Sequence, residues 1–156
     1  MSFEHVGLKT DEARKLGKML NGVLANYQVF YQNVRGYHWN IKGENFFSLH
    51  QQFEDLYNRA HMNIDEIAER ILTLEETPLH AFSDYIERSK IQEARNISDG
   101  RKAAQHIVDG YGTLIKLERE VIEFASEVGD EATADMLTGY ISEQEKSVWM
   151  FKSFLG

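Results

Sequence analysis

The stretch NFFSLHQQFEDLYNRAHMNIDEIAERILTLE, residues 45–75, decides the fold of this chain. Its apolar residues recur every three or four positions, which places them on one face of an α-helix. Neither glycine nor proline interrupts the stretch, so we expect one helix from about Asn45 to Glu75. The face expected to enter the core consists of Phe46, Leu49, Phe53, Leu56, Ala60, Ile64, Ile67, Ile71 and Leu74.

Three more stretches with helical periodicity predict three further long helices. We expect them at about Asp11 to Tyr37 or His38, at Asp99 to Val128 and at Asp130 to Phe154, with Thr10 as the N-cap of the first. Their expected core faces are Leu16, Leu20, Val23, Tyr27, Phe30, Val34 and Tyr37; then Ile107, Tyr111, Leu114, Val121, Ala125 and Val128; then Leu137, Ile141, Gln144, Val148, Phe151 and Leu155.

The connections between these helices differ in length. Asn40–Glu44 is a tight link in which Gly43 can take a positive φ, and Gly129 separates the last two helices. The connection from Glu76 to Ser98 is long; it begins with a helix-ending Thr77-Pro78, and we expect a short helix at about Phe82 to Ser89 followed by a loop. The sequence therefore predicts an all-α fold, a ferritin-like four-helix bundle with a short extra helix in its one long crossover.

The composition limits the class of protein. The 156 residues are enough for one domain, which we expect to span residues 1–156, and no cysteine is available for disulfides or thiolate metal sites. The sequence has no signal peptide and no apolar run of membrane-spanning length, so we expect a cytoplasmic protein. The net charge is −8, and residues 1–12 contain one lysine and no long basic tail. DNA binding is therefore not expected.

A stripe of potential metal ligands lies one position beyond the core face of the second helix. It consists of His50, Glu54, His61, Asp65 and Glu69, at spacings of 4, 7, 4 and 4 residues. Imidazoles and carboxylates suit iron, and other divalent metals could substitute for it at such a site. The stripe is roughly 28 Å long at the helical rise, too long for one metal centre. Two antiparallel copies of the helix would bring the first pair of ligands of one chain near the last pair of the other, which predicts a metal site between subunits.

Di-iron centres inside a single helical bundle usually use Glu-x-x-His motifs. None of the six histidines has a glutamate three positions before it. The missing motif favours the site between subunits over a centre inside one bundle.

Three segments together resemble the Dps family of mini-ferritins. They are HWNIKGENFFSLH at residues 38–50, DEIAER at residues 65–70 and WMFKSFL at residues 149–155. The resemblance covers nearly the whole chain. It implies a hollow dodecameric shell that oxidises Fe²⁺, preferably with H₂O₂ and more slowly with O₂, stores the ferric mineral and so protects the cell against oxidative stress.

The resemblance also implies a ligand set for the di-iron site. His38, His50 and Glu54 match the ligands from one subunit, and Asp65 and Glu69 match those from its twofold mate. The third ligand is often aspartate in the family, so Glu54 departs from the pattern by one methylene.

Other polar residues leave alternatives open. His61 is either an auxiliary metal or proton-handling residue near the twofold axis or a structural histidine paired with Asp65. Trp39 is either an electron donor, as the resemblance implies, or an aromatic residue packed at the bundle end. Glu131 and Asp135, with Glu127, would line an iron-entry pore according to the resemblance, although acidic residues also favour a helix N-terminus.

Two rival functions remain as alternatives to iron oxidation. One is nucleoid binding, as some Dps relatives bind DNA, although the acidic charge argues against it. The other is a shell with degenerate metal sites, against which the five chemically intact ligand positions argue.

Overall fold

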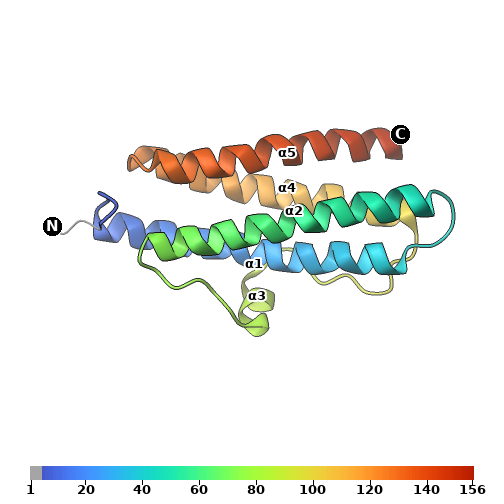
Figure 1. The fold of residues 1–156 in the computed structure, drawn as a ribbon, viewed down its shortest axis with the longest axis horizontal. Coiled ribbons are helices and arrows are strands. Elements are labelled where there is room, and N and C mark those ends of the chain that lie inside the picture. Colours follow the sequence, from blue (N-terminus) through green and yellow to red (C-terminus); the bar gives the residue numbers. More distant parts are fainter. Residues whose placement is uncertain (1–4) are drawn as a thin grey trace.

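Four long helices run side by side along the molecule, and a fifth, short helix lies outside them (Figure 1). The computed structural model describes residues 5–156 and contains no strand in that range. Its helices are α1 (Thr10–Asn40), α2 (Phe46–Thr73), α3 (Phe82–Arg88), α4 (Gly100–Glu127) and α5 (Glu131–Leu155). The predicted all-α, ferritin-like bundle with a short extra helix in its crossover is confirmed.

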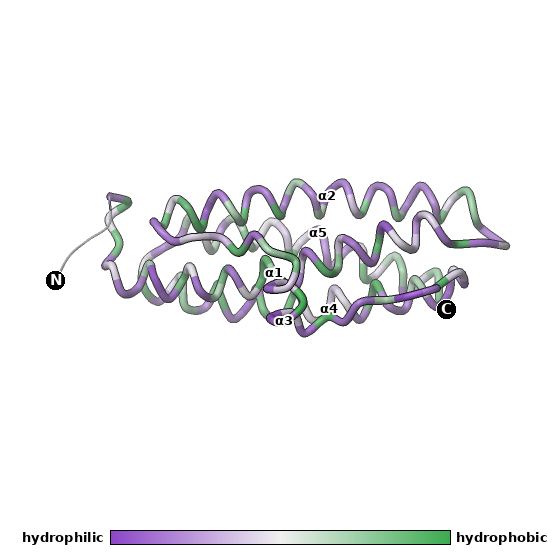
Figure 2. Tube along the Cα trace, turned by 90° about the horizontal axis from the view of Figure 1, so that it is seen from below, coloured by the Kyte–Doolittle hydropathy of each residue, from purple (hydrophilic) through white to green (hydrophobic). Residues whose placement is uncertain are grey.

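The predicted core faces meet between the four long helices. All seven residues predicted for α1 are buried, and so are seven of the nine predicted for α2, where Phe46 and Ile64 are partly exposed. Hydrophobic and hydrophilic residues alternate along each long helix because only one face of each is covered (Figure 2). The remaining faces, including the ligand stripe of α2, border solvent.

The helix ends lie within three residues of the predicted ones. Thr10 is not an N-cap: the backbone oxygen of Lys9 already accepts from the Ala13 N–H at 2.9 Å, so the helical ladder begins one residue earlier. Asp99 and Asp130, predicted as first helical residues, are the caps, accepting hydrogen bonds from the backbone N–H groups of Lys102 and Thr133. At the other end, α1 continues to Asn40, past the predicted His38.

The link between α1 and α2 is as tight as predicted. Gly43 has a φ of +92°, a left-handed conformation that glycine adopts without strain, and Asn45 follows with a φ of +64°. The Lys42 N–H donates to the backbone oxygen of Ser98 at 2.9 Å, which ties this link to the end of the crossover. The last turn of α1 and the first turn of α2 are thereby held close together.

Three buried asparagines of α1 hold the crossover against the bundle. Asn21 bonds the backbone of Thr77 and Leu79, Asn26 accepts from the N–H groups of Lys90 and Ile91, and Asn33 bonds the backbone of Gln92 and Ala94. The crossover runs back along the bundle with α3 against α1, so α4 starts at the end where α2 starts (Figure 1). Nowhere in residues 5–156 is a helix both long enough and apolar enough to span a membrane.

Candidate metal centre

The predicted ligands fall into two groups on the structure. His38, near the end of α1, meets His50 and Glu54 in the first three turns of α2, because the tight link folds these segments together. Asp65 and Glu69 lie several turns further along α2, on its exposed side. One chain therefore brings three of the five ligands together and leaves two apart.

His38 and His50 exchange hydrogen bonds with each other's backbone. Nδ1 of His38 lies 2.7 Å from the carbonyl oxygen of His50, and Nδ1 of His50 lies 2.7 Å from the carbonyl oxygen of His38. A carbonyl oxygen only accepts, so both Nδ1 atoms carry the hydrogen and donate it. With the hydrogen on Nδ1, Nε2 is the ring atom that can bind a metal through its lone pair.

The two imidazole rings lie parallel, and a carboxylate lies beside them. Their centroids are 3.7 Å apart with an interplanar angle of 12°. Nε2 of His38 is 3.8 Å from Oε1 of Glu54. The His38 side chain is only 8% exposed whereas that of Glu54 is 40% exposed, so the group opens toward solvent on the Glu54 side.

Two aromatic rings fix the outer faces of the histidines. Phe46 stacks on His50 at 5.0 Å between centroids, and Tyr57 meets the ring of His38 edge-on at 5.3 Å. The half-buried side chain of Tyr57 packs against the core and also lies beside a predicted ligand, a position that the sequence analysis did not identify. Its position seven residues after His50, and so on the same helical face, is the signal that could have identified it.

Asp65 and Glu69 form an exposed acidic pair one helical turn apart. The charge of Asp65 and its hydrogen bond with Glu69, in that order, raise the pKa of Glu69 above its ordinary value. A bound cation would relieve this repulsion. Across residues 5–156 of a single chain, no three histidine, aspartate or glutamate side chains converge as a complete metal-binding group.

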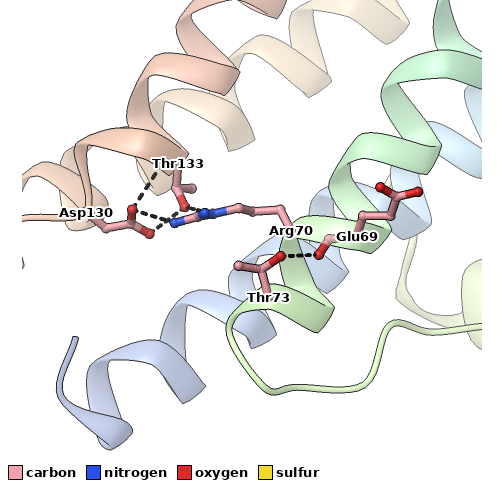
Figure 3. Close-up of polar contacts among 5 residues, drawn as sticks. All are labelled: Glu69, Arg70, Thr73, Asp130 and Thr133. Atoms are coloured by element: carbon pink, nitrogen blue, oxygen red, sulfur yellow. Dashed lines mark hydrogen bonds and ion pairs between the residues drawn. The ribbon is translucent and has the colours of Figure 1, made fainter. Parts of the chain in front are cut away.

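The last turns of α2 are anchored by Arg70, which points away from its neighbour Glu69 (Figure 3). Its guanidinium pairs with the carboxylate of Asp130 at 2.8 Å and donates to Oγ1 of Thr133 at 2.8 Å. Asp130 in turn caps α5 through the Thr133 N–H at 3.1 Å. This clamp, which sequence analysis missed, fixes α2 to the α4–α5 turn and leaves Glu69 on the outer side.

The other predicted residues are all on the surface. His61 is exposed, 5.9 Å from the ring of Tyr31, and it makes no ion pair with Asp65 in the described part of the chain. Trp39 is 56% exposed, with the guanidinium of Arg35 at 4.8 Å from its ring centroid, so it is not packed into the bundle end. Glu127, Glu131 and Asp135 are exposed around the α4–α5 turn.

Comparison with known proteins supports the family indicated by the fold and the histidine group. Residues 17–156 match the model of the ferritin-like domain. The crystal structure of a DPS protein from Vibrio cholerae O1, described as a member of a broad superfamily of ferritin-like diiron-carboxylate proteins, is 48% identical with a TM-score of 0.98 over 100% of this chain and 98% of that one.

Two curated relatives cover almost the same length. An uncharacterized protein of Haemophilus influenzae is 47% identical over 98% of this chain and 96% of its own. A DNA protection during starvation protein of Porphyromonas gingivalis is 40% identical over 97% of this chain and 96% of its own.

Proposed function

Because the chain belongs to the Dps group of ferritin-like proteins, we propose that it oxidises ferrous iron at sites shared by two subunits and stores the ferric product inside a dodecameric shell. The observation that carries the proposal is the crossed pair of hydrogen bonds between His38 and His50. These bonds occupy both Nδ1 atoms and leave both Nε2 atoms available to a metal, and the Glu54 carboxylate lies 3.8 Å from Nε2 of His38. Two imidazoles and a carboxylate form a ligand set that fits Fe²⁺. The protein would act in the cytoplasm as an enzyme that detoxifies iron.

The second half of the ligand set would come from another copy of the chain. Asp65 and Glu69 lie too far along α2 to reach the histidines of their own chain, roughly 22 Å from His50 to Asp65 at the helical rise. A twofold axis between antiparallel α2 helices would place them opposite His38, His50 and Glu54 of the partner and would generate two equivalent sites. His61, between the two groups, would then lie near the axis.

The proposed reaction removes both participants in Fenton chemistry. Each H₂O₂ takes one electron from each of two Fe²⁺ ions and, with two protons, leaves as two water molecules, so no hydroxyl radical forms. The imidazoles of His38 and His50 hold iron without adding charge, and the carboxylates neutralise the charge that rises as Fe²⁺ becomes Fe³⁺. Exposed acidic residues such as Glu131 and Asp135 would attract Fe²⁺ toward the shell.

The first experiment adds Fe²⁺ anaerobically and then one H₂O₂ per two iron ions, with ferric absorbance and hydroxyl-radical trapping followed together. We expect fast oxidation without trapped radical in the wild-type protein. Oxidation no faster than in buffer would contradict the proposal.

A mixing experiment tests whether the site is shared between subunits. His50→Ala and Asp65→Ala would each inactivate a homogeneous assembly, whereas a mixed dimer keeps one site with all its ligands. Random mixing should therefore restore about a quarter of the wild-type sites. No recovery in an assembly that contains both variants would contradict a shared site, even if iron oxidation itself were established.

Direct DNA binding is a weaker candidate, although relatives carry the name DNA protection during starvation protein. The net charge of −8 opposes association with a polyanion. We expect no DNA retardation in a gel shift at moderate salt, and protection in cells through iron chemistry.

A further inference from the structure

A cluster of polar side chains lies at the centre of the bundle, separate from the proposed iron site. Each of the four long helices contributes to it, and every member is 8% exposed or less. The members are Tyr27 of α1, Asn63 of α2, Glu118 of α4, and Tyr140 and Gln144 of α5. Glu118 is fully buried, which is rare for a glutamate without a cationic partner.

The hydrogen bonds of this cluster leave some acceptors without a donor. The Tyr27 hydroxyl donates to Oε2 of Glu118 at 3.5 Å and accepts from the amide nitrogens of Asn63 and Gln144. Three buried atoms have no hydrogen-bond partner, namely Oε1 of Glu118, Oε1 of Gln144 and the hydroxyl oxygen of Tyr140. If Glu118 is ionised, two of these atoms only accept and just one hydroxyl can donate. A proton on Oε1 of Glu118 supplies the missing donor.

No positive charge compensates Glu118. None of the ion pairs in residues 5–156 includes it. Arg59 of α2 is engaged at the rim with Glu143 of α5 at 3.4 Å, and both side chains are about half exposed. The other ionisable groups around the cluster are Glu66 of α2 and the phenols of Tyr27, Tyr111 and Tyr140.

The space and the donor set exclude a metal centre. The adjoining cavity, lined by Tyr27, Asn63, Tyr140 and Gln144 among others, has a volume of about 10 Å³, at most enough for one water molecule. One carboxylate with no imidazole is a poor set for iron. A proton is small enough to bind at this site. Burial raises the pKa of Glu118 to about 8, while hydrogen bonds from Gln144 and Tyr27 oppose the rise.

We propose that the centre of the bundle is a proton-binding site: Glu118 is neutral at neutral pH, and losing its proton in alkaline solution weakens the packing of α4 against α1 and α5. The proposal does not depend on iron oxidation. The folded chain holds this proton above pH 4.5, the ordinary pKa, whereas the unfolded chain releases it. The ratio of folded to unfolded protein should therefore fall by up to tenfold per pH unit from about pH 4.5 to about pH 8, and the loss should level off above that range.

The test compares the full-length wild-type protein with Glu118→Gln, in which an amide replaces the neutral acid. Denaturant unfolding is measured from about pH 5 to about pH 9, with Glu120→Gln, an exposed position on the same helix, as the control. We expect the wild type and the control to lose stability with rising pH more steeply than Glu118→Gln. Equal slopes in all three proteins would overturn the proposal.

A spectroscopic measurement needs no stable variant of Glu118. Infrared spectra of Glu69→Gln, which removes the other carboxyl with a raised pKa, should show a protonated-carboxyl band at neutral pH that disappears in alkaline solution. Absence of that band at neutral pH would also overturn the proposal.

Discussion

His38 and His50 are held in place by backbone carbonyls, whereas Asp65 and Glu69 stand exposed on the outer side of α2. The first group is partly buried and lies between two aromatic rings, and its two imidazoles are oriented without any metal. The second group carries two repelling carboxylates on the part of α2 that Arg70 anchors. Helix α2 therefore contributes to a rigid half-site of two histidines and one carboxylate and carries an exposed, charged half-site of two carboxylates.

Because of this difference, the two half-sites would contribute to iron binding in different ways. Preorganised imidazoles bind without losing further side-chain entropy. The acidic pair supplies charge, which attracts the cation and becomes less repulsive once it is bound. The following predictions test whether each half-site behaves in this way, beginning with the largest expected effect.

Replacing His50 with alanine should remove the rigid half-site. The variant loses one ligand. It also loses the ring that donates to the backbone oxygen of His38 and stacks on the His38 side chain. We expect peroxide-driven Fe²⁺ oxidation to fall to the rate in buffer, as measured by ferric absorbance. His80→Gln, at an exposed histidine outside the ligand set, should retain the wild-type rate.

Replacing Arg70 with methionine should remove the ion pair that anchors α2 next to the charged half-site. The change leaves Asp130, whose side chain is 3% exposed, without its cation. We expect the free energy of unfolding to fall by about 3 kcal/mol, measured by denaturant titration. Arg14→Met, which breaks an exposed pair with Glu76, should lower it by less than about 1 kcal/mol. Similar losses in both variants would mean that the clamp is no stronger than a surface ion pair.

Replacing Glu54 with aspartate tests how much placement matters in the rigid half-site. The shorter side chain keeps the charge but withdraws a carboxylate that lies 3.8 Å from His38 Nε2. We expect the oxidation rate to change by less than about tenfold, whereas Glu54→Gln should reduce it more. An equal loss in both variants would show that position, more than charge, controls this ligand.

Replacing Asp65 with asparagine should produce the smallest effect, within the charged half-site. Without the neighbouring negative charge, the pKa of Glu69 should fall toward its ordinary value. An NMR titration of the Glu69 carboxyl in metal-free protein measures the change. Asp55→Asn, at an exposed position on the same helix, should leave the pKa of Glu69 unchanged.

Periodic features were predictable from the sequence. The core faces of α1 and α2 follow directly from apolar spacing, and the histidine at the start of α2 meets His38 because the intervening link is short. The loss of the predicted Thr10 cap has a local cause, since the ladder already starts at the Lys9 carbonyl.

Features that depend on contacts distant in sequence were not predictable in the same way. Asn26 bonds residues 64 and 65 positions away, and Arg70 bonds a carboxylate 60 positions away. Glu118 lies four residues after Leu114 and three before Val121, which places it on the core face of α4, but it was not assigned there because a charged residue is rarely buried. The spacing was therefore the available signal, and the assembled bundle shows which polar partners surround this position.

The crossed hydrogen bonds of His38 and His50 also have a consequence for the order of folding. They join residues only 12 positions apart, whereas the contact between Tyr27 and Glu118 spans 91. Short chain separations close faster because less loop entropy is lost. We therefore expect the histidine pair to form in the α1–α2 hairpin as soon as residue 50 is available, before the second hairpin has docked.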